Sequence, residues 1–148
     1  MVSRERFALS VSVFAYVEFG NRVLMLRRSN TGWHDGDFSL PAGALDCKER
    51  LEVAVARELA EETGLTASPE SFRLAHTIHV RNPDGTEWLG FFFAIRKPEG
   101  EPVLIETDKH DLLAWKDNSN LPGNTIPYVR QAISCIRDGV NYSSYGWA

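Results

Sequence analysis

The sequence predicts an α/β layered domain in which one sheet is covered on both sides. Three observations support this class: a strand-like alternation opens the chain, an amphipathic helix lies near its middle, and a second amphipathic helix lies near its end. Strands combined with helices in this order are typical of layered α/β folds. At 148 residues the chain fits a single domain spanning residues 1–148 and is long enough to bury a substantial core.

The first predicted strand runs through residues 7–19, where apolar and more polar side chains alternate. Its apolar set is Phe7, Leu9, Val11, Val13, Ala15, Val17 and Phe19. A period of two residues indicates a half-buried strand. Arg4 and Arg6 ahead of this run superficially resemble a secretory signal, but no small-residue cleavage site follows, and the strand interpretation is favoured.

A turn at Gly20 and Asn21 leads to a second strand over residues 22–27, and a hairpin is the simplest connection. Its centre, residues 23–26, is apolar without interruption, as expected of a strand covered on both faces. Residues 29–37 have the composition of a loop, and a short strand over 38–40 leads to a second loop around Gly43.

The central helix is well specified by local signals. Asp46 followed by Glu49 forms an N-terminal capping pattern, and Gly64 is a natural C-terminal stop. Its predicted apolar stripe consists of Leu51, Val55 and Leu59. This stripe would face the core and leave the opposite face of the helix toward a cleft.

The second half of the chain begins at the interruption by Pro69. Residues 72–81 and 87–96 read as two strands that flank a turn, and residues 112–115 read as another short strand. Pro127 can open a final helix through Ile136 that ends at Gly139. Its predicted apolar face consists of Ile126, Val129, Ile133 and either Ile136 or Cys135. The aromatic tail at 142–147 would fold against the body or cover a dimer neighbour.

Three carboxylates on the central helix carry the strongest functional signal. Glu58, Glu61 and Glu62 stand at i, i+3 and i+4, so a helix places them on one face, where like charges repel. A bound cation would relieve this repulsion, and ligands that are all oxygen atoms point to Mg2+ or Mn2+. A merely solvated acidic face would explain neither Gly43 nor Arg57, which can reach Glu61 as an i, i+4 partner.

The spacing of these residues resembles the Nudix box. Gly43 is followed after five residues by Glu49, and after seven more by the run from Arg57 to Leu65. The resemblance implies an α/β/α sandwich with a mixed sheet, and hydrolysis of a nucleoside diphosphate linked to another group. Ala42 is a departure, because many family members carry a second glycine there; alanine also occurs in the family.

The resemblance also implies roles for the box residues. The carbonyl of Gly43 and the carboxylates of Glu58, Glu61 and Glu62 are candidate metal ligands. Glu61 or Glu58 could take the proton of the attacking water, and the sequence does not separate these roles. Arg57 would orient the glutamates and completes the set of candidate catalytic residues.

Outside the box, the resemblance indicates substrate-binding and metal-binding candidates. Arg28 is the candidate phosphate-contacting arginine, and Asn124 lies close to where MutT-like members place a base-reading asparagine. Asp111 is the candidate outlying metal ligand, with Glu106 and Asp108 as competitors.

Base recognition usually needs an aromatic face. Trp33 and Phe91 are the predicted stacking residues, and His34 and Trp88 are further candidates. At most two of the three side chains in the Phe91–Phe93 run can line a pocket, because a strand points them to both faces.

Composition restricts the partners. With 16 basic and 20 acidic residues, net charge −4, the chain lacks the basic excess expected for binding a nucleic-acid polymer. Its two cysteines make neither a disulfide framework nor a zinc spacing, which favours the cytoplasm. No apolar run approaches the length that spans a membrane, and a homodimer is one arrangement that could cover the tail.

The sequence therefore predicts a Mg2+-dependent or Mn2+-dependent Nudix hydrolase that converts a nucleoside triphosphate to a monophosphate and pyrophosphate. An NDP-sugar, ADP-ribose or a dinucleoside polyphosphate is the alternative substrate within the same class. A nucleotide sensor of the same fold that binds without cleavage is the alternative from another class. Such non-catalytic domains commonly lose the glutamates, which are complete here.

Overall fold

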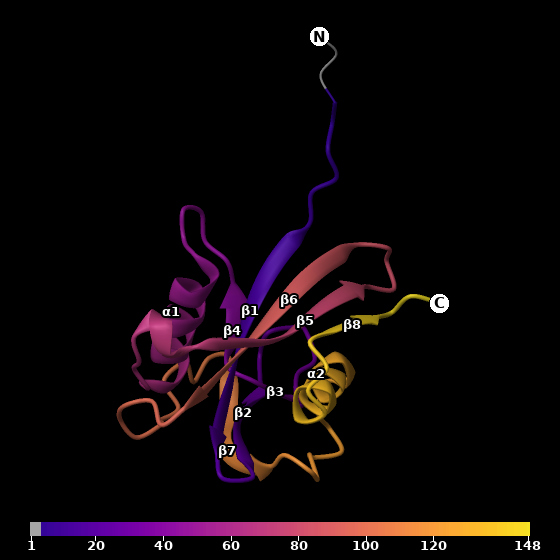
Figure 1. Ribbon diagram of the computed structural model, residues 1–148. Helices are drawn as coiled ribbons and strands as arrows, with labels where there is room; N and C mark the ends of the chain where they lie inside the picture. The colour runs from indigo at the N-terminus through magenta and orange to yellow at the C-terminus, as the bar shows by residue number, and fades with distance from the viewer. Residues whose placement is uncertain (1–3) are drawn as a thin grey trace.

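The structure is a computed structural model that describes residues 4–148. Within these residues one mixed sheet lies between helices α1 and α2 (Figure 1). The strands are β1 (Ser10–Phe19), β2 (Arg22–Arg28), β3 (Phe38–Ser39), β4 (Ala42–Ala44), β5 (Arg73–Arg81), β6 (Glu87–Arg96), β7 (His110–Asp117) and β8 (Tyr142–Tyr145). The helices are α1 (Leu51–Thr63) and α2 (Pro127–Arg137), with a short 3-10 helix at Pro69–Ser71. The predicted α/β class with a mixed sheet is confirmed.

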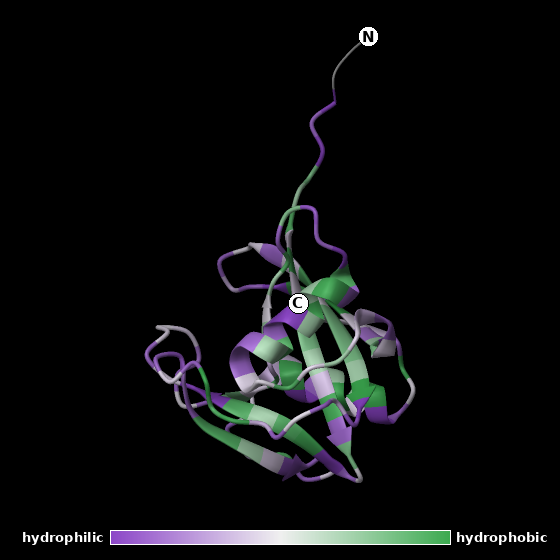
Figure 2. Cartoon of the chain, turned by 90° about the vertical axis from the view of Figure 1, so that its left-hand side faces the viewer, coloured by the Kyte–Doolittle hydropathy of each residue, from purple (hydrophilic) through white to green (hydrophobic). Residues whose placement is uncertain are grey.

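Strand β1 divides the core into two layers. Val13, Ala15 and Val17 pack with buried residues of α1, whereas Phe14 and Tyr16 pack with buried residues of α2. The expectation of a half-buried strand was wrong for this central part, because a helix covers each face. Figure 2 shows apolar residues, in green, along the strands at the centre of the sheet. The strand also begins later than predicted, at Ser10, and leaves Phe7 72% exposed.

The centre of the sheet is a parallel pair. β1 and β6 pair from Ser10 opposite Trp88 to Glu18 opposite Arg96. On the other edge of β6 lies the antiparallel β5, and β8 pairs in parallel with β5. The tail therefore folds against the body of the protein, as one of the two expectations for it stated.

The predicted hairpin between β1 and β2 is short. The two strands pair only where Glu18 faces Val23 and Phe19 faces Arg22. Beyond this point β2 pairs with β7 and β3, while β1 pairs with β4. Residues 38–44 cross from β2 to β1 where these strands separate, and this crossing places Gly43 opposite Val13. Strand β4 was not predicted, since this stretch read as a loop.

Helix α1 ends as predicted but begins later. Gly64 has φ 77° and donates its backbone N–H to the carbonyl of Ala60, which terminates the helix. The helix starts at Leu51 after Arg50, without a side-chain cap. The pattern predicted at Asp46 and Glu49 does not cap the helix: Glu49 accepts the backbone N–H of Asp46 at 3.1 Å, but both residues lie in the preceding loop. Val55 and Leu59 are fully buried, whereas Leu51 is partly buried at the edge of the same cluster.

The remaining elements match their predictions with small shifts. β6 has the predicted bounds, and β5 begins one residue later than expected. β7 is longer than the predicted 112–115 because it pairs along the whole of β2. α2 begins at Pro127, and its buried side is formed by Val129, Ala132 and Ile133.

A buried histidine fastens β8 to the sheet. His76 in β5 is 0% exposed, and its Nδ1 donates to the carbonyl of Val140 at 2.8 Å. Its Nε2 lies 2.8 Å from Oγ of Ser143, which also accepts a hydrogen bond from Nε2 of Gln131 at 3.0 Å. Burial lowers the pKa of His76 below its usual 6.5, because the charged ring would lose its hydration.

This geometry predicts an acid-sensitive contribution of His76 to stability. The neutral ring stabilises the fold above the unfolded pKa of 6.5, and the contribution is lost as the pH falls through the lower folded pKa. The wild type should therefore exceed His76→Phe in free energy of unfolding by less at about pH 5 than at about pH 8. Urea titrations at both pH values measure it, and a constant difference would contradict the prediction.

Candidate active site

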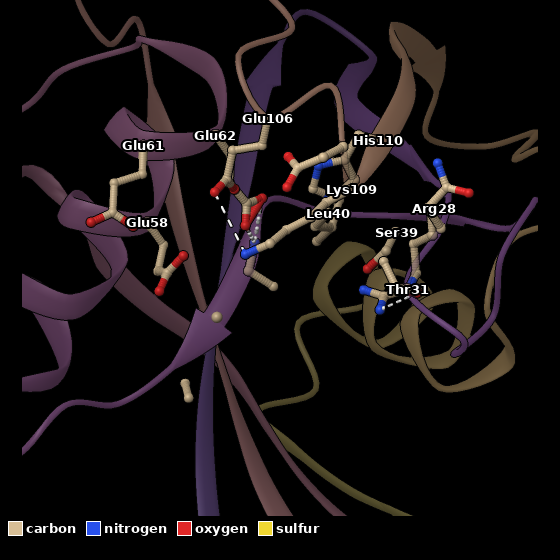
Figure 3. Close-up of a pocket in the computed structure, with 15 residues that line it drawn as sticks. Arg28, Thr31, Ser39, Leu40, Glu58, Glu61, Glu62, Glu106, Lys109 and His110 are labelled. Carbon is tan, nitrogen blue, oxygen red and sulfur yellow. Dashed lines mark hydrogen bonds and ion pairs between the residues drawn. The ribbon is translucent and has the colours of Figure 1, made fainter.

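The carboxylates of α1 form one wall of a cleft of about 550 Å³, here called the acidic cleft (Figure 3). The segment 39–44 forms its floor, and the loop before β7 forms the opposite wall. Its lining residues are Arg28, Asn30, Thr31, Ser39, Leu40, Ala42, Gly43, Ala44, Glu58, Glu61, Glu62, Glu106, Asp108, Lys109 and His110. The structure thus brings together all four predicted metal ligands of the box and Arg28.

Burial makes the negative charge in this cleft costly. Glu62 is only 4% exposed, and its carboxylate accepts a long hydrogen bond of 3.3 Å from the backbone N–H of Ala42. Burial, together with neighbouring Glu58, raises the pKa of Glu62 to about 9. Burial also raises the pKa of Glu58, although Arg57 opposes this shift. Buried carboxylates with so few partners fit a site for a divalent cation.

Arg57 lies outside the cleft and is bonded to the acidic residues that form its wall. Its Nε donates to Glu49 at 2.7 Å and one terminal nitrogen donates to Glu58 at 2.8 Å. The predicted contact with Glu61 is present but longer, at 3.4 Å. The bond from Arg57 holds the pKa of Glu49 below its usual range. Arg57 therefore positions the acidic residues of the loop and the helix, and it does not line the cleft.

Gly43 has a steric role that the sequence did not reveal. A Cβ atom at this position would overlap the carboxyl group of Glu58. The backbone of Gly43 is in an ordinary region of φ, so space rather than conformational freedom requires glycine here. The missing side chain lets the Glu58 carboxylate lie directly against β4.

The opposite wall contains a group that the sequence identified only in part. Glu62, Glu106 and His110 each offer a ligand atom, and these atoms lie within 4.8 Å of one another. Nζ of Lys109 lies 3.6 Å from the Glu106 carboxylate. His110 is 7% exposed, and burial, aided by the charge of Arg28, lowers its pKa to about 4. A histidine amid the acidic run 106–111 was the available signal for this residue.

Asp111, the predicted outlying metal ligand, lies outside the acidic cleft. Its carboxylate accepts a 2.7 Å bond from Nε of Arg27, which lowers the pKa of Asp111. Asp111 is the extra residue of a β-bulge, because Arg27 pairs with Leu112 and Arg28 pairs with His110, and its exposed carboxylate lies against Arg27 instead of in the cleft. The geometry favours Glu106, one of its competitors, as the additional carboxylate.

A second cleft, here called the aromatic cleft, adjoins the acidic cleft. Its lining residues are Ser10, Ser12, Phe14, Arg28, Trp33, Ser39, Ala42, Gly43, Ala44, Asn82, Thr86, Glu87, Trp88 and Tyr128. Both clefts share Arg28, Ser39 and residues 42–44. Arg28 donates to the carbonyl of Trp33 at 2.6 Å and to Oγ1 of Thr31 at 3.0 Å, which fixes its guanidinium at the boundary between the clefts.

Only some of the predicted base-binding residues line the aromatic cleft. Trp33 lines the aromatic cleft and is 46% exposed. Trp88 and Tyr128, whose rings meet edge to face at 5.0 Å, line it as well. Phe91 is on the other face of β6, packed against the α1 layer. Asn124 donates to the carbonyl of Gly36 at 2.7 Å and lies outside both lining sets.

Comparison with known families settles the class of the protein. The model of the NUDIX domain matches residues 6–128. The chain belongs to the Nudix family. A curated Nudix relative, Phosphatase NudJ of Escherichia coli K12, is 36% identical over 105 residues, which cover 69% of this chain and 67% of the relative. The chain is a hydrolase of the family that acts on nucleoside diphosphate-linked substrates.

Solved Nudix structures share the fold. A MutT NUDIX hydrolase from Burkholderia pseudomallei superposes with a TM-score of 0.79 at 26% identity, covering 86% of this chain and 98% of that one. A MutT protein from Bacillus halodurans gives a TM-score of 0.75 at 21% identity, with 93% and 90% covered. Neither helix of the described chain is both long and apolar enough to cross a membrane.

The contact of Gly43 with Glu58 predicts a sensitive position. Gly43→Ala should displace the Glu58 carboxylate and lower kcat by about 100-fold, because small misplacements of reacting groups cost about this much. The fold should persist, since the side chain that must move is flexible at its end. Gly123→Ala is the matched control, because its Cβ would meet nothing within 4 Å. Equal rates for both variants in steady-state hydrolysis assays would contradict the steric role.

Proposed function

We propose that this protein hydrolyses a nucleoside triphosphate to a nucleoside monophosphate and pyrophosphate with Mg2+ or Mn2+. The observation that carries the proposal is the arrangement of Glu58, Glu61 and Glu62 on one wall of a cleft that Arg28 also lines. Acidic groups suit a cation, and a guanidinium suits a phosphate. The adjoining aromatic cleft offers a place for a base attached to those phosphates.

The box residues hold the cation, accept a proton or position other residues in this proposal. Glu58, Glu62 and the carbonyl of Gly43 would hold the cation, which, when bound, neutralises phosphate charge and lowers the pKa of a water. Glu61 or Glu58 would accept the proton of the attacking water. Arg57 would keep Glu58 in place, because it is bonded both to Glu58 and to Glu49 in the preceding loop.

Arg28 and the aromatic residues would set the orientation of the substrate. Arg28 lies at the boundary of the two clefts, so a phosphate chain in the acidic cleft and a base in the aromatic cleft would meet beside it. Trp33, Trp88 and Tyr128 would provide apolar contact for the base. Phe91 and Asn124 are not part of this proposal because of their positions.

A second candidate activity follows from the relatives. The curated relatives carry the name phosphatase, which favours release of orthophosphate from the end of a phosphate chain. An NDP-sugar, ADP-ribose or a dinucleoside polyphosphate remains an alternative substrate for the same cleft. The non-catalytic sensor is less favoured because the glutamate set is complete.

We further propose that residues 1–148 act as a single catalytic domain in the cytoplasm. The sheet extends through β8, beyond the part that the family model matches, and Cys47 and Cys135 are free thiols. The homodimer stays a prediction. The proposed ligand is a small nucleotide and not a nucleic-acid polymer, in keeping with the net charge of −4.

The proposal predicts dependence on a divalent cation and on the carboxylates. Excess EDTA should abolish turnover, and Mg2+ should restore it. Glu58→Gln or Glu61→Gln, or both, should lower kcat by at least about 100-fold while thermal unfolding still shows a folded protein. Glu52→Gln is the control on the same helix, because Glu52 lies outside both clefts. Wild-type rates in all three variants would place the active site elsewhere.

The bond that is cleaved gives a separate prediction. A triphosphate cut between the α and β phosphates should yield monophosphate and pyrophosphate as the first products. Hydrolysis in oxygen-18 water, followed by mass spectrometry, identifies which product receives the label. Nucleoside diphosphate with orthophosphate would instead establish the phosphatase alternative, and exclusive cleavage of an NDP-sugar would reassign the substrate.

A further inference from the structure

The wall of the acidic cleft opposite α1 contains a buried ring nitrogen without a partner. Nδ1 of His110 is inaccessible to solvent and has no hydrogen-bond partner in the part of the chain that the structure describes. Buried polar atoms are nearly always paired, so an orphaned one indicates a missing ligand or water. Figure 3 shows His110 beside Glu106, on the other side of Glu62 from Glu58 and Glu61.

The charges around this ring suit a cation. Glu62 is 4% exposed, and Glu106 adds a second carboxylate from the loop before β7. Lys109 is the cationic group nearest to Glu106, with its Nζ 3.6 Å away. Its ammonium is on a flexible and more exposed side chain, so a metal ion could replace it beside the carboxylates.

We propose that Glu62, Glu106 and His110 form a cation site with one nitrogen ligand, here called the His110 site, which takes Mn2+ or a later first-row transition cation in preference to Mg2+. Neutral imidazole suits transition cations, whereas Mg2+ prefers oxygen. This proposal rests on the proposed function in one respect: Glu62 is a cation ligand in both. It assigns to His110 a role that the box does not contain.

The distances allow such a site after small movements. The three ligand atoms lie within 4.8 Å of one another. Ligands at about 2.0–2.2 Å from one ion lie about 3 Å apart in neighbouring octahedral positions and about 4.4 Å apart on opposite sides, so closure needs the ligand atoms to move toward one another. The side chains of Glu62 and Glu106 can supply these shifts by rotation, whereas the buried ring stays fixed.

Pulsed electron paramagnetic resonance of the Mn2+-loaded protein tests the proposal directly. A histidine nitrogen bound to Mn2+ gives a nitrogen hyperfine coupling, which changes in a characteristic way when the histidines carry nitrogen-15. This coupling should appear in the wild type and vanish in His110→Gln. His79→Gln is the matched control, because His79 also faces a carboxylate, Glu87, at 2.8 Å but lies outside the acidic cleft. The coupling should persist in this control.

A second variant keeps the test decisive if His110→Gln does not fold. Glu106→Gln leaves the buried ring in place and removes one charged ligand, so it should weaken Mn2+ binding at the His110 site and reduce the coupling. Absence of nitrogen coupling in the Mn2+-saturated wild type overturns the proposal. Coupling that persists unchanged in folded His110→Gln, or in Glu106→Gln, also overturns it.

The outcomes separate this proposal from the proposed function. Hydrolysis with Mg2+ is measured on the same preparations, and EPR requires no turnover. Active wild type without the coupling would refute the His110 site and leave the hydrolase assignment intact. Coupling in a protein that cleaves no nucleotide would establish the His110 site and refute the proposed hydrolysis.

Discussion

The hydrogen bonds of the Arg57 guanidinium are the interactions on which the α1 wall of the acidic cleft depends. One guanidinium contacts Glu49 in the loop, Glu58 and Glu61 on the helix, and the carbonyl of Ala44 in β4 at 3.2 Å. Since β4 is itself paired with β1, these bonds connect the acidic face of α1 to the sheet. A lysine could supply the charge and three donors, but not the rigid planar fork of five donors with which the guanidinium reaches these four groups.

The two clefts differ in the chemical character of their linings. The acidic cleft gathers groups that suit a cation and phosphates, whereas the aromatic cleft offers rings and a few polar groups. Both depend on the separation of β1 from β2, because residues 38–44 fill the gap and contribute backbone to each cleft. Trp33 and Tyr128 therefore lie in a different cleft from the carboxylates of α1.

Local signals determined what the sequence could predict. The glutamate spacing, the stop at Gly64 and the bounds of β6 all depend on neighbouring residues, and each agrees with the structure. The capping pattern at Asp46 and Glu49 was also local; Glu49 accepts the backbone N–H of Asp46 and is bonded to Arg57 as well, but the helix begins only at Leu51.

Contacts between distant segments could not be predicted from one sequence. The choice between Asp111 and Glu106 depends on the bulge in the pairing of β7 with β2, which leaves Asp111 against Arg27, and on the loop before β7, which contains Glu106. The packing of Phe91 against the α1 layer likewise follows from its register opposite Val13. Asn124 was predicted to read the base because of its position along the chain. In the structure its side-chain amide donates to the carbonyl of Gly36.

The parallel pairing of β1 with β6 has a consequence for how the protein is made. Val13 and Phe91 are neighbours in the sheet, but α1 with all its glutamates lies between them in the chain. During synthesis the helix emerges before its sheet can close, and parallel pairing across so long a loop is slow. Until β6 arrives, Val13, Ala15 and Val17 lack one neighbouring strand. The acidic face of α1 is thus translated before the sheet that supports its helix can be completed.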